Sequence, residues 1–139
     1  MTTIAANTEM MAADTQMDDD GLIYHIKKIY RVNDDLVGFA GEVAEGLRFV
    51  NWYFRHEPGD FDDEFSMNET VALVLTKDKK LLMFESHVPM EVLEGHTAIG
   101  SGSGMALVAM DCGHSPSTAI MIASRRDSAT GSKVITEIL

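Results

Sequence analysis

Short apolar runs separated by polar turns dominate the first part of the chain. Residues 2–6 and 10–13 are apolar and are separated by the polar residues 7–9. This pattern predicts two strands joined by a tight hairpin. Residues 22–32 and 36–41, with a polar turn between them, are predicted as two further strands.

The pattern then changes to helical spacing. Residues 42–56 place Val43, Leu47, Val50 and Phe54 three or four positions apart, which predicts a helix that turns its apolar side to the core. We expect the aromatic residues of this helix to be core residues rather than ligands.

The rest of the chain returns to strands and ends with two helices and a strand. An acidic segment, residues 57–69, is predicted as a loop. Glycine and proline mark the helix boundaries, because Gly113 is a typical helix stop and Ser115-Pro116 a typical helix start. The remaining predictions are strands at 71–76, 81–86, 96–100 and 133–139, and helices starting at 103 and 116.

This order of elements indicates the α+β class, in which antiparallel sheets are covered by helices. The strands show little polar alternation, so we expect the sheets to be buried on both faces. A sandwich of two antiparallel sheets between helix layers fits both observations. The length of 139 residues predicts a single domain spanning 1–139.

Composition narrows the set of partners. The net charge of −11 argues against nucleic acid and anionic membranes as partners, because both require a basic surface. No apolar run approaches the ~20 residues of a membrane helix, and the start lacks the regions of a signal peptide. The single cysteine, Cys112, is expected to be a buried thiol in a protein of the reducing cytoplasm.

No metal site is predicted. The five histidines lack the spacing of helical metal ligands. The acidic run at 18–20, followed by Gly21, lacks the spaced ligands and the closing glutamate of a calcium loop, and a solvated turn is expected there.

The first candidate catalytic residue lies at the start of the chain. Removal of Met1 would make Thr2 the amino terminus, and Thr2 would then carry a hydroxyl and a base, its own α-amine. A threonine hydroxyl needs such a base, and an α-amine with a pKa of about 7.7–8.0 is partly neutral in a cell. Thr2 is therefore a candidate nucleophile; the alternative is an ordinary strand threonine.

A charged pair could activate that hydroxyl. Asp14 closes the second predicted strand, which a tight hairpin brings beside the chain start. Lys28 lies in a largely apolar strand, where a lysine is costly unless it is paired. An Asp14–Lys28 pair beside Thr2 would hold positive charge near the hydroxyl and lower its pKa. The alternative is a surface lysine next to Lys27.

Two glycine-containing turns could complete a site. At residues 38–46 small residues join a strand to a helix, and the Gly41 N–H is a candidate donor to an oxyanion. At residues 100–104 Ser101 precedes a helix, without the lysine of a phosphate-binding loop and without a clean nucleophile elbow. Either turn could also serve backbone geometry alone.

Taken together, these features resemble the proteasome β-type peptidases, including bacterial HslV, among the N-terminal nucleophile hydrolases. The matching motifs span nearly the whole chain in order: TTIAA, AADTQ, IKKIYRV, GFAGEVAEG, AIGSGSG and RDSATG. The resemblance implies a four-layer αββα sandwich. It also implies a threonine endopeptidase that works inside a self-compartmentalising ring, without metal or organic cofactor.

The resemblance assigns roles to particular residues. Thr2 is the nucleophile after Met1 removal, and Phe39 lies where the family has its S1 pocket residue. Thr130 stands where the family has a serine beside the threonine amine. The residues with implied catalytic roles are Thr2, Asp14, Lys28, Gly41, Ser101, Asp127 and Thr130.

The chain also departs from the family pattern. The first hairpin is shorter than usual, and Asp18 stands where a threonine is common. The family has two long helices after the GFAG-like strand, whereas only one is readable here and the acidic segment 57–69 replaces the second. One helix of the sandwich is therefore predicted to be missing or reduced.

The resemblance implies a homo-oligomeric ring that acts on peptides or unfolded proteins, and it is compatible with an ATPase partner. Two rival functions stay open. One is a catalytically silent ring or scaffold protein that has kept the fold. The other is an amidohydrolase of the same superfamily, which would prefer simple amides to peptides.

Overall fold

A computed structural model describes residues 2–56, 65–131 and 133–139. Within these residues the strands are β1 (Thr3–Asn7), β2 (Met10–Asp14), β3 (Gln16–Asp19), β4 (Leu22–His25), β5 (Ile29–Val32), β6 (Asp35–Ala40), β7 (Val71–Leu75), β8 (Leu81–Phe84), β9 (Pro89–Val92), β10 (His96–Gly100) and β11 (Val134–Ile138). The helices are α1 (Val43–Phe54), α2 (Ser103–Asp111) and α3 (Pro116–Ser124). This mixture of helices and antiparallel sheets confirms the predicted combination of elements.

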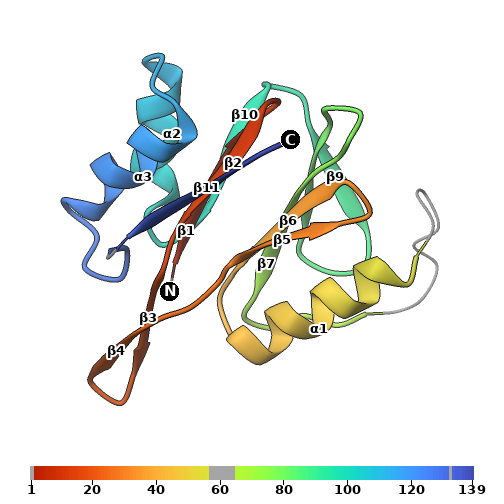
Figure 1. The fold of residues 1–139 in the computed structure, drawn as a ribbon, viewed down its shortest axis with the longest axis horizontal. Coiled ribbons are helices and arrows are strands. Elements are labelled where there is room, and N and C mark those ends of the chain that lie inside the picture. The colour runs from red at the N-terminus through yellow and green to blue at the C-terminus, as the bar shows by residue number, and fades with distance from the viewer. Residues whose placement is uncertain (1, 57–64, 132) are drawn as a thin grey trace.

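The first sheet has the strand order β10-β1-β2-β11, with all neighbours antiparallel. In it Thr3 lies opposite Gly100 and Ile4 lies opposite Ala13. The predicted hairpin between the first two apolar segments is confirmed as β1 and β2. Because β11 pairs with β2, the first and last strands of the chain belong to the same sheet (Figure 1).

The second sheet has the order β5-β6-β7-β8-β9 and is also antiparallel. All six residues of β6 are buried, from Asp35 to Ala40, and four of the five residues of β7 are buried. The expectation that apolar strands with little alternation are covered on both faces is confirmed for these central strands.

The prediction of one continuous strand over residues 22–32 is wrong. The segment is split into β4, which forms a separate hairpin with β3, and β5, which belongs to the second sheet. The Ile26 N–H bonds to the carbonyl of Thr15 at 2.9 Å, and the side chain of Lys28 turns inward to Asp14. The chain thereby passes from the hairpin to the second sheet at residues 26–28.

Three apolar clusters hold these elements together. The first joins the two sheets and includes Ile4 and Met11 from one and Leu36 and Leu73 from the other. The second joins the first sheet to α2 and α3, which cover its outer face (Figure 1). Seven of its nine buried residues are alanines, so these layers approach closely: Ala5, Ala12, Ala98, Ala106, Ala109, Ala119 and Ala123.

The third cluster is aromatic and joins the second sheet to α1, on the far side from α2 and α3 (Figure 1). The predicted core face of α1 is only partly correct, since Val50 packs against this cluster but Leu47 and Phe54 are exposed. The helix instead buries Phe49, Trp52 and Tyr53. The shift follows from Gly46, which has no side chain and lets another aromatic ring from the sheet lie against the helix backbone.

Two further expectations concern the surface. Cys112 was expected to be buried but is exposed at the end of α2, because the helix stops one residue earlier and the apolar cluster beneath is already filled by alanines. Of the predicted acidic loop at 57–69, residues 57–64 lie outside the described residues, and residues 65–69 contain no helix. No helix within the described residues is long and apolar enough to cross a membrane.

Candidate active site

The backbone around Thr2 is fixed from both sides. Thr2 directly precedes β1, and its carbonyl accepts the N–H of Ser101 at 3.0 Å. Gly100 has a φ of +99°, and a Cβ added there would lie 1.7 Å from the Thr2 carbonyl oxygen. Only glycine therefore permits this approach, and the approach holds Thr2 at the end of the sheet.

Three side chains from separate segments meet at this point. The Lys28 amine donates to the Thr2 hydroxyl oxygen, and the Thr2 hydroxyl in turn contacts Asp14 Oδ1. Lys28 Nζ lies 3.1 Å from Asp14 Oδ1. The exposed fractions of Thr2, Asp14 and Lys28 are 5%, 1% and 4%. The surface-lysine alternative for Lys28 is excluded.

Backbone donors orient the Asp14 carboxylate. Its Oδ1 accepts the N–H of Thr3 at 3.0 Å, and its Oδ2 accepts the N–H of Gly131 at 3.0 Å. Asp14 is the last residue of β2, and Gly131 lies in the loop before β11. Two chain segments more than a hundred residues apart therefore set the direction in which the carboxylate faces Lys28.

Burial dominates the electrostatics of Lys28. Removal from water lowers the pKa of its amine, and the opposing attraction of Asp14 and the hydrogen bond to it only partly offset this. The amine also donates to the carbonyl of Gln16 at 2.5 Å. Lys28 is thus held against the Thr2 hydroxyl as a hydrogen-bond donor that gives up its proton more readily than an exposed lysine.

A second hydrogen-bonded group lies on the other side of the chain start. Ser101 Oγ and Thr130 Oγ1 both donate to Asp127 Oδ2, at 2.5 Å and 2.6 Å. Thr130 also lies 2.6 Å from Thr3 Oγ1, which accepts the N–H of Gly102 at 2.9 Å. This group connects the β10–α2 turn to the residue that follows Thr2.

The pKa of Asp127 is lowered. Partial burial acts to raise the pKa of this carboxyl, but hydrogen bonds from Ser101, Thr130 and the Ala129 N–H outweigh that effect. The carboxylate is therefore the stable form at neutral pH, and it can accept hydrogen bonds from a cationic or water partner.

Gly41 and Phe39 share a small cavity with Thr2. This cavity of about 80 Å³ is also lined by Lys28, Ile26 and Val43 among others. Phe39 is only 2% exposed and stacks on the ring of Tyr30, with 6.2 Å between the ring centroids. Phe39 thus forms the floor of the cavity rather than a projecting wall.

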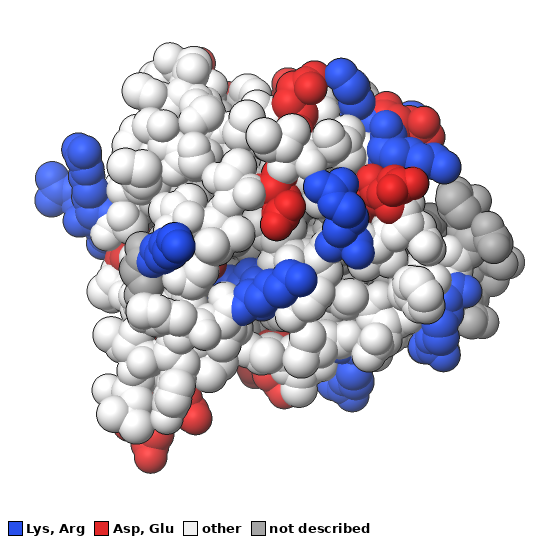
Figure 2. Space-filling view, in the orientation of Figure 1, with Lys and Arg blue, Asp and Glu red and all other residues white. Residues whose placement is uncertain are grey.

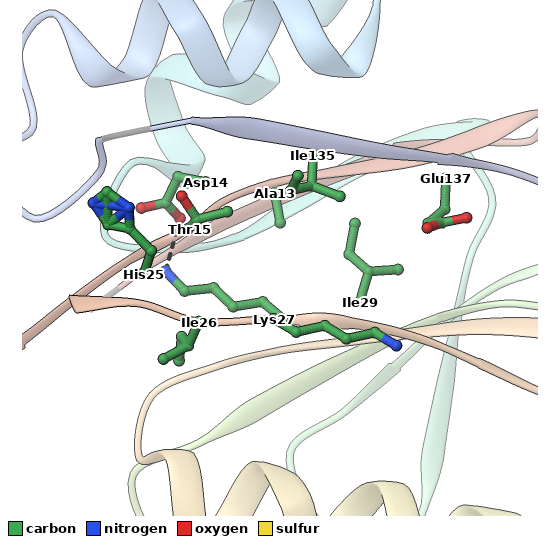
Figure 3. A pocket seen from close by; sticks show the side chains of 10 residues that line it. Ala13, Asp14, Thr15, His25, Ile26, Lys27, Ile29, Ile135 and Glu137 are labelled. Carbon is green, nitrogen blue, oxygen red and sulfur yellow. Dashed lines mark hydrogen bonds and ion pairs between the residues drawn. The ribbon is translucent and has the colours of Figure 1, made fainter.

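Lys28 also lines a larger cavity of about 370 Å³. Figure 3 shows Ala13 and Ile135 from the first sheet facing Ile29 from the second, with Glu137 at one end. Lys28 and Ile26 therefore border both the small cavity at Thr2 and the larger, mostly apolar space between the sheets.

Of the seven residues with roles assigned by resemblance, the six others thus lie around Thr2, in two hydrogen-bonded groups and in the lining of the small cavity. Sequence reasoning missed Thr3, Gly131 and Glu45. Thr3 and Gly131 act through contacts that form only when distant segments meet. Glu45, a charged residue among the small residues 38–46, was a visible signal, because a carboxylate at the buried start of a helix requires donors. Within the described residues no group of three His, Cys, Asp or Glu side chains could hold a metal ion.

Comparison with known proteins gives a fold but no sequence family. No protein-family model and no curated protein matches the sequence. A solved structure of Thiobacillus denitrificans BPH matches with a TM-score of 0.76 and 18% identity, covering 99% of this chain and 96% of that chain. The same protein in complex with epoxomicin matches with a TM-score of 0.73 and 17% identity, covering 99% of this chain and 97% of that one.

Eukaryotic HslV from Trypanosoma brucei is a third match. Its TM-score is 0.69 at 18% identity, and the alignment covers 98% of both chains. At such identities the likeness concerns the fold alone. The chain therefore has a proteasome-type fold like that of HslV over essentially its whole length.

Proposed function

We propose that this chain is a threonine endopeptidase whose nucleophile is the hydroxyl of Thr2 after removal of Met1. The observation that supports it best is the contact of a buried lysine and a buried aspartate with that hydroxyl. A buried charge pair is costly unless it is used or compensated. Met1 itself lies outside the described residues.

In the proposed reaction Thr2 Oγ1 attacks the carbonyl carbon of a peptide bond. The hydroxyl proton passes to the α-amine of Thr2, directly or through water, because that amine is the available base. Lys28 donates a hydrogen bond to Oγ1 and stabilises the developing negative charge, and Asp14 orients Lys28. The Gly41 N–H, beside the same cavity, donates to the oxyanion of the tetrahedral intermediate.

The intermediate then collapses. The C–N bond breaks, and the α-ammonium group gives its proton to the leaving amine, so that the acyl group stays on Oγ1 as an ester. Water attacks this ester and the α-amine takes the proton from the water; the α-ammonium then gives that proton to Oγ1, which leaves as a hydroxyl and frees the carboxylic acid product. Ser101, Asp127 and Thr130 hold the amine and the attacking water. This reaction uses no metal or organic cofactor.

The small cavity suggests a substrate preference. Phe39 forms its apolar floor, with Ile26 and Val43 beside it, and an ionised side chain seated against Phe39 would lose water without gaining a partner from these three residues. We expect cleavage after apolar residues. A clear preference for basic or acidic residues at that position would contradict this role of Phe39.

We also assign the fold to the four-layer αββα sandwich and expect a closed homo-oligomeric ring with inward-facing sites, compatible with an ATPase partner, in the cytoplasm. The outer face of α2 and α3 supports association, since Val108 and Met121 are 61% and 53% exposed. Figure 2 shows few charged side chains over this region. Sedimentation that finds only a 15.3 kDa monomer at micromolar concentration would contradict the ring.

The decisive experiment measures Met1 removal and hydrolysis together. Intact-mass spectrometry gives the fraction of protein that begins at Thr2, and fluorogenic peptides give the rate. We expect hydrolysis to follow that fraction, Thr2→Ala to be inactive even when processed, and epoxomicin, which the Thiobacillus BPH structure contains, to block the reaction. Robust hydrolysis by protein that keeps Met1 would overturn the mechanism.

The same assay separates the rivals. Processed protein that cleaves no peptide and no amide would support a silent ring or scaffold. Processed protein that cleaves simple amides better than peptides would support an amidohydrolase.

A further inference from the structure

Glu45 is a buried carboxylate near the proposed oxyanion donor. It lies in the first turn of α1, four residues after Gly41, and is 3% exposed. Three donors from the segment that leads into β7 converge on it. They are the N–H groups of Asn68 and Glu69, at 2.8 Å and 3.0 Å, and the hydroxyl of Thr70, at 3.1 Å.

Thr70 carries this contact to the backbone beside Gly41. Its hydroxyl oxygen accepts the N–H of Glu42 at 3.0 Å, and the hydroxyl proton faces two acceptors, Glu45 Oε1 at 3.1 Å and the Glu42 carbonyl at 3.3 Å. Thr70 is 4% exposed and cannot replace these contacts with water. A continuous chain of hydrogen bonds therefore runs from Glu45 through Thr70 to the peptide group that follows Gly41.

Gly41 connects two peptide groups that are fixed separately, one to Ala40 on the strand side and one to Glu42 on the helix side. On the strand side, β6 pairs with β7 up to Ala40, which lies opposite Val71. On the helix side, Thr70 holds the N–H of Glu42. Gly41 itself has a φ of +131°, and an added Cβ would lie 2.1 Å from the backbone oxygen of Glu69. The Gly41 N–H belongs to the Ala40–Gly41 peptide group at the end of β6, and the contact of residues 69 and 70 fixes the other side of Gly41, so the backbone at Gly41 is held from both sides.

We infer that Glu45 is a positioning residue for the oxyanion donor Gly41, acting through Thr70 and the backbone of residues 68–70. This inference rests on the proposed function. Glu45 touches neither the substrate nor the reacting atoms. It keeps the segment before β7 pressed against Gly41, so that the N–H points into the cavity that Gly41 shares with Thr2.

The chemistry at position 45 requires a carboxylate. Three donors need a group that only accepts, and a carboxylate provides two oxygens with about four lone-pair sites. Glu45→Gln keeps the size but turns an NH2 group toward one of these donors. Glu45→Asp keeps the charge on a shorter side chain and should restore part of the lost function.

The kinetic test separates positioning from substrate binding. We expect Glu45→Gln to lower kcat by at least about 10-fold, which is below the 10²–10³-fold cost of deleting an oxyanion donor, with KM within about twofold. A peptide aldehyde, which forms a tetrahedral adduct with the hydroxyl, should bind more weakly in proportion to the fall in kcat/KM. The matching peptide amide should bind unchanged.

Thr70→Val is the second variant, because it preserves shape but removes the acceptor for the Glu42 N–H. We expect it to reproduce the kcat defect of Glu45→Gln, and the two changes together should cost little more than either alone. The matched controls are Glu91→Gln and Thr136→Val, which alter exposed side chains far from this network. Wild-type kcat in Glu45→Gln and in Thr70→Val would overturn the inference.

An activity-free readout keeps this inference distinct from the proposed function. In the amide NMR spectrum, Glu45→Gln should shift the resonances of Gly41 and Glu42, while Glu91→Gln should not. A processed wild type that cleaves nothing would reject the proposed function. Unshifted Gly41 and Glu42 resonances in folded Glu45→Gln would reject the positioning role, whatever the activity.

Discussion

The two polar groups on either side of Thr2 differ in burial and in charge. On one side, Asp14 and Lys28 are 1% and 4% exposed and carry opposite charges. On the other, Asp127 is joined to the hydroxyls of Ser101 and Thr130, and Ser101 is open to solvent. A buried charge pair can change the proton affinity of a neighbouring hydroxyl, because burial strengthens electrostatic interactions. The solvent-exposed group of one carboxylate and two hydroxyls can bind an amine or a water molecule and release it again.

This contrast predicts unequal costs of mutation. Loss of one member of the buried pair should remove activation of the nucleophile and leave the other charge buried without a partner. Loss of the open group should loosen the amine and its water, which solvent can partly replace. The following experiments test that order.

Lys28→Ala should have the largest effect. We expect turnover to fall about a thousandfold, because the donor that faces the developing charge is lost. The free energy of unfolding should fall by about 3 kcal/mol, because Asp14 remains buried without its cation. Fluorogenic peptide kinetics and urea denaturation measure the two effects. Lys27→Ala, at the neighbouring exposed lysine, should change neither turnover nor stability. Wild-type turnover in Lys28→Ala would contradict the role assigned to Lys28.

Asp127→Asn should have an intermediate effect, with kcat lower by about 10-fold, less than the ~10²–10⁴-fold of a group that transfers the proton itself. The amide keeps the size but weakens the contacts with Ser101 and Thr130. Steady-state kinetics on protein confirmed by mass to lack Met1 would measure it. A loss as large as that of Lys28→Ala would show that the buried pair and the solvent-exposed group contribute equally to turnover.

Asp127 should also contribute to the loss of stability at acid pH. Its folded pKa lies below the ordinary 3.8, so its contribution to stability is present above that value and is lost as pH falls through the folded pKa. Thermal unfolding from about pH 6 down to about pH 2 should therefore show a shallower acid loss in Asp127→Asn than in wild type. Equal slopes would mean that the hydrogen bonds to Asp127 do not persist in solution.

The smallest effect should be a change in the free energy of unfolding at alkaline pH. The folded pKa of Lys28 lies below its ordinary 10.5 because of burial. Between these two values the unfolded chain binds more protons, so stability should rise with pH in that window. Urea denaturation of wild type and Lys28→Met should show this rise in the wild type alone. A wild-type curve that is flat or falling relative to Lys28→Met would indicate that Asp14 outweighs burial.

Part of the fold and of the site could be predicted from the sequence. The hairpin of β1 and β2 follows from local apolar runs, and a lysine among apolar residues signals a partner. The split of residues 22–32 could not be predicted, because it depends on the contact of Lys28 with Asp14, which closes only in the folded chain. The core face of α1 was misjudged because Gly46, not the apolar spacing, decides which side meets the sheet.

Glu45 and Thr3 were missed for a related reason. Apolar periodicity says which face is buried, but not which polar residue is buried among the apolar ones. Their partners, the N–H groups of residues 68 and 69 and the hydroxyl of Thr130, lie 23, 24 and 127 residues away in the sequence. Only the folded chain brings them into contact.

The alanine layer between the first sheet and α2–α3 limits how this molecule can change. Alanines on both sides, such as Ala12 and Ala119, leave few long side chains that could rotate to absorb an added methyl group. A larger residue there has to displace a helix or a strand, and β1 carries Thr2 at its end. Substitutions far from the reacting hydroxyl should therefore be tolerated only as compensating pairs, one on a helix and one on the facing strand.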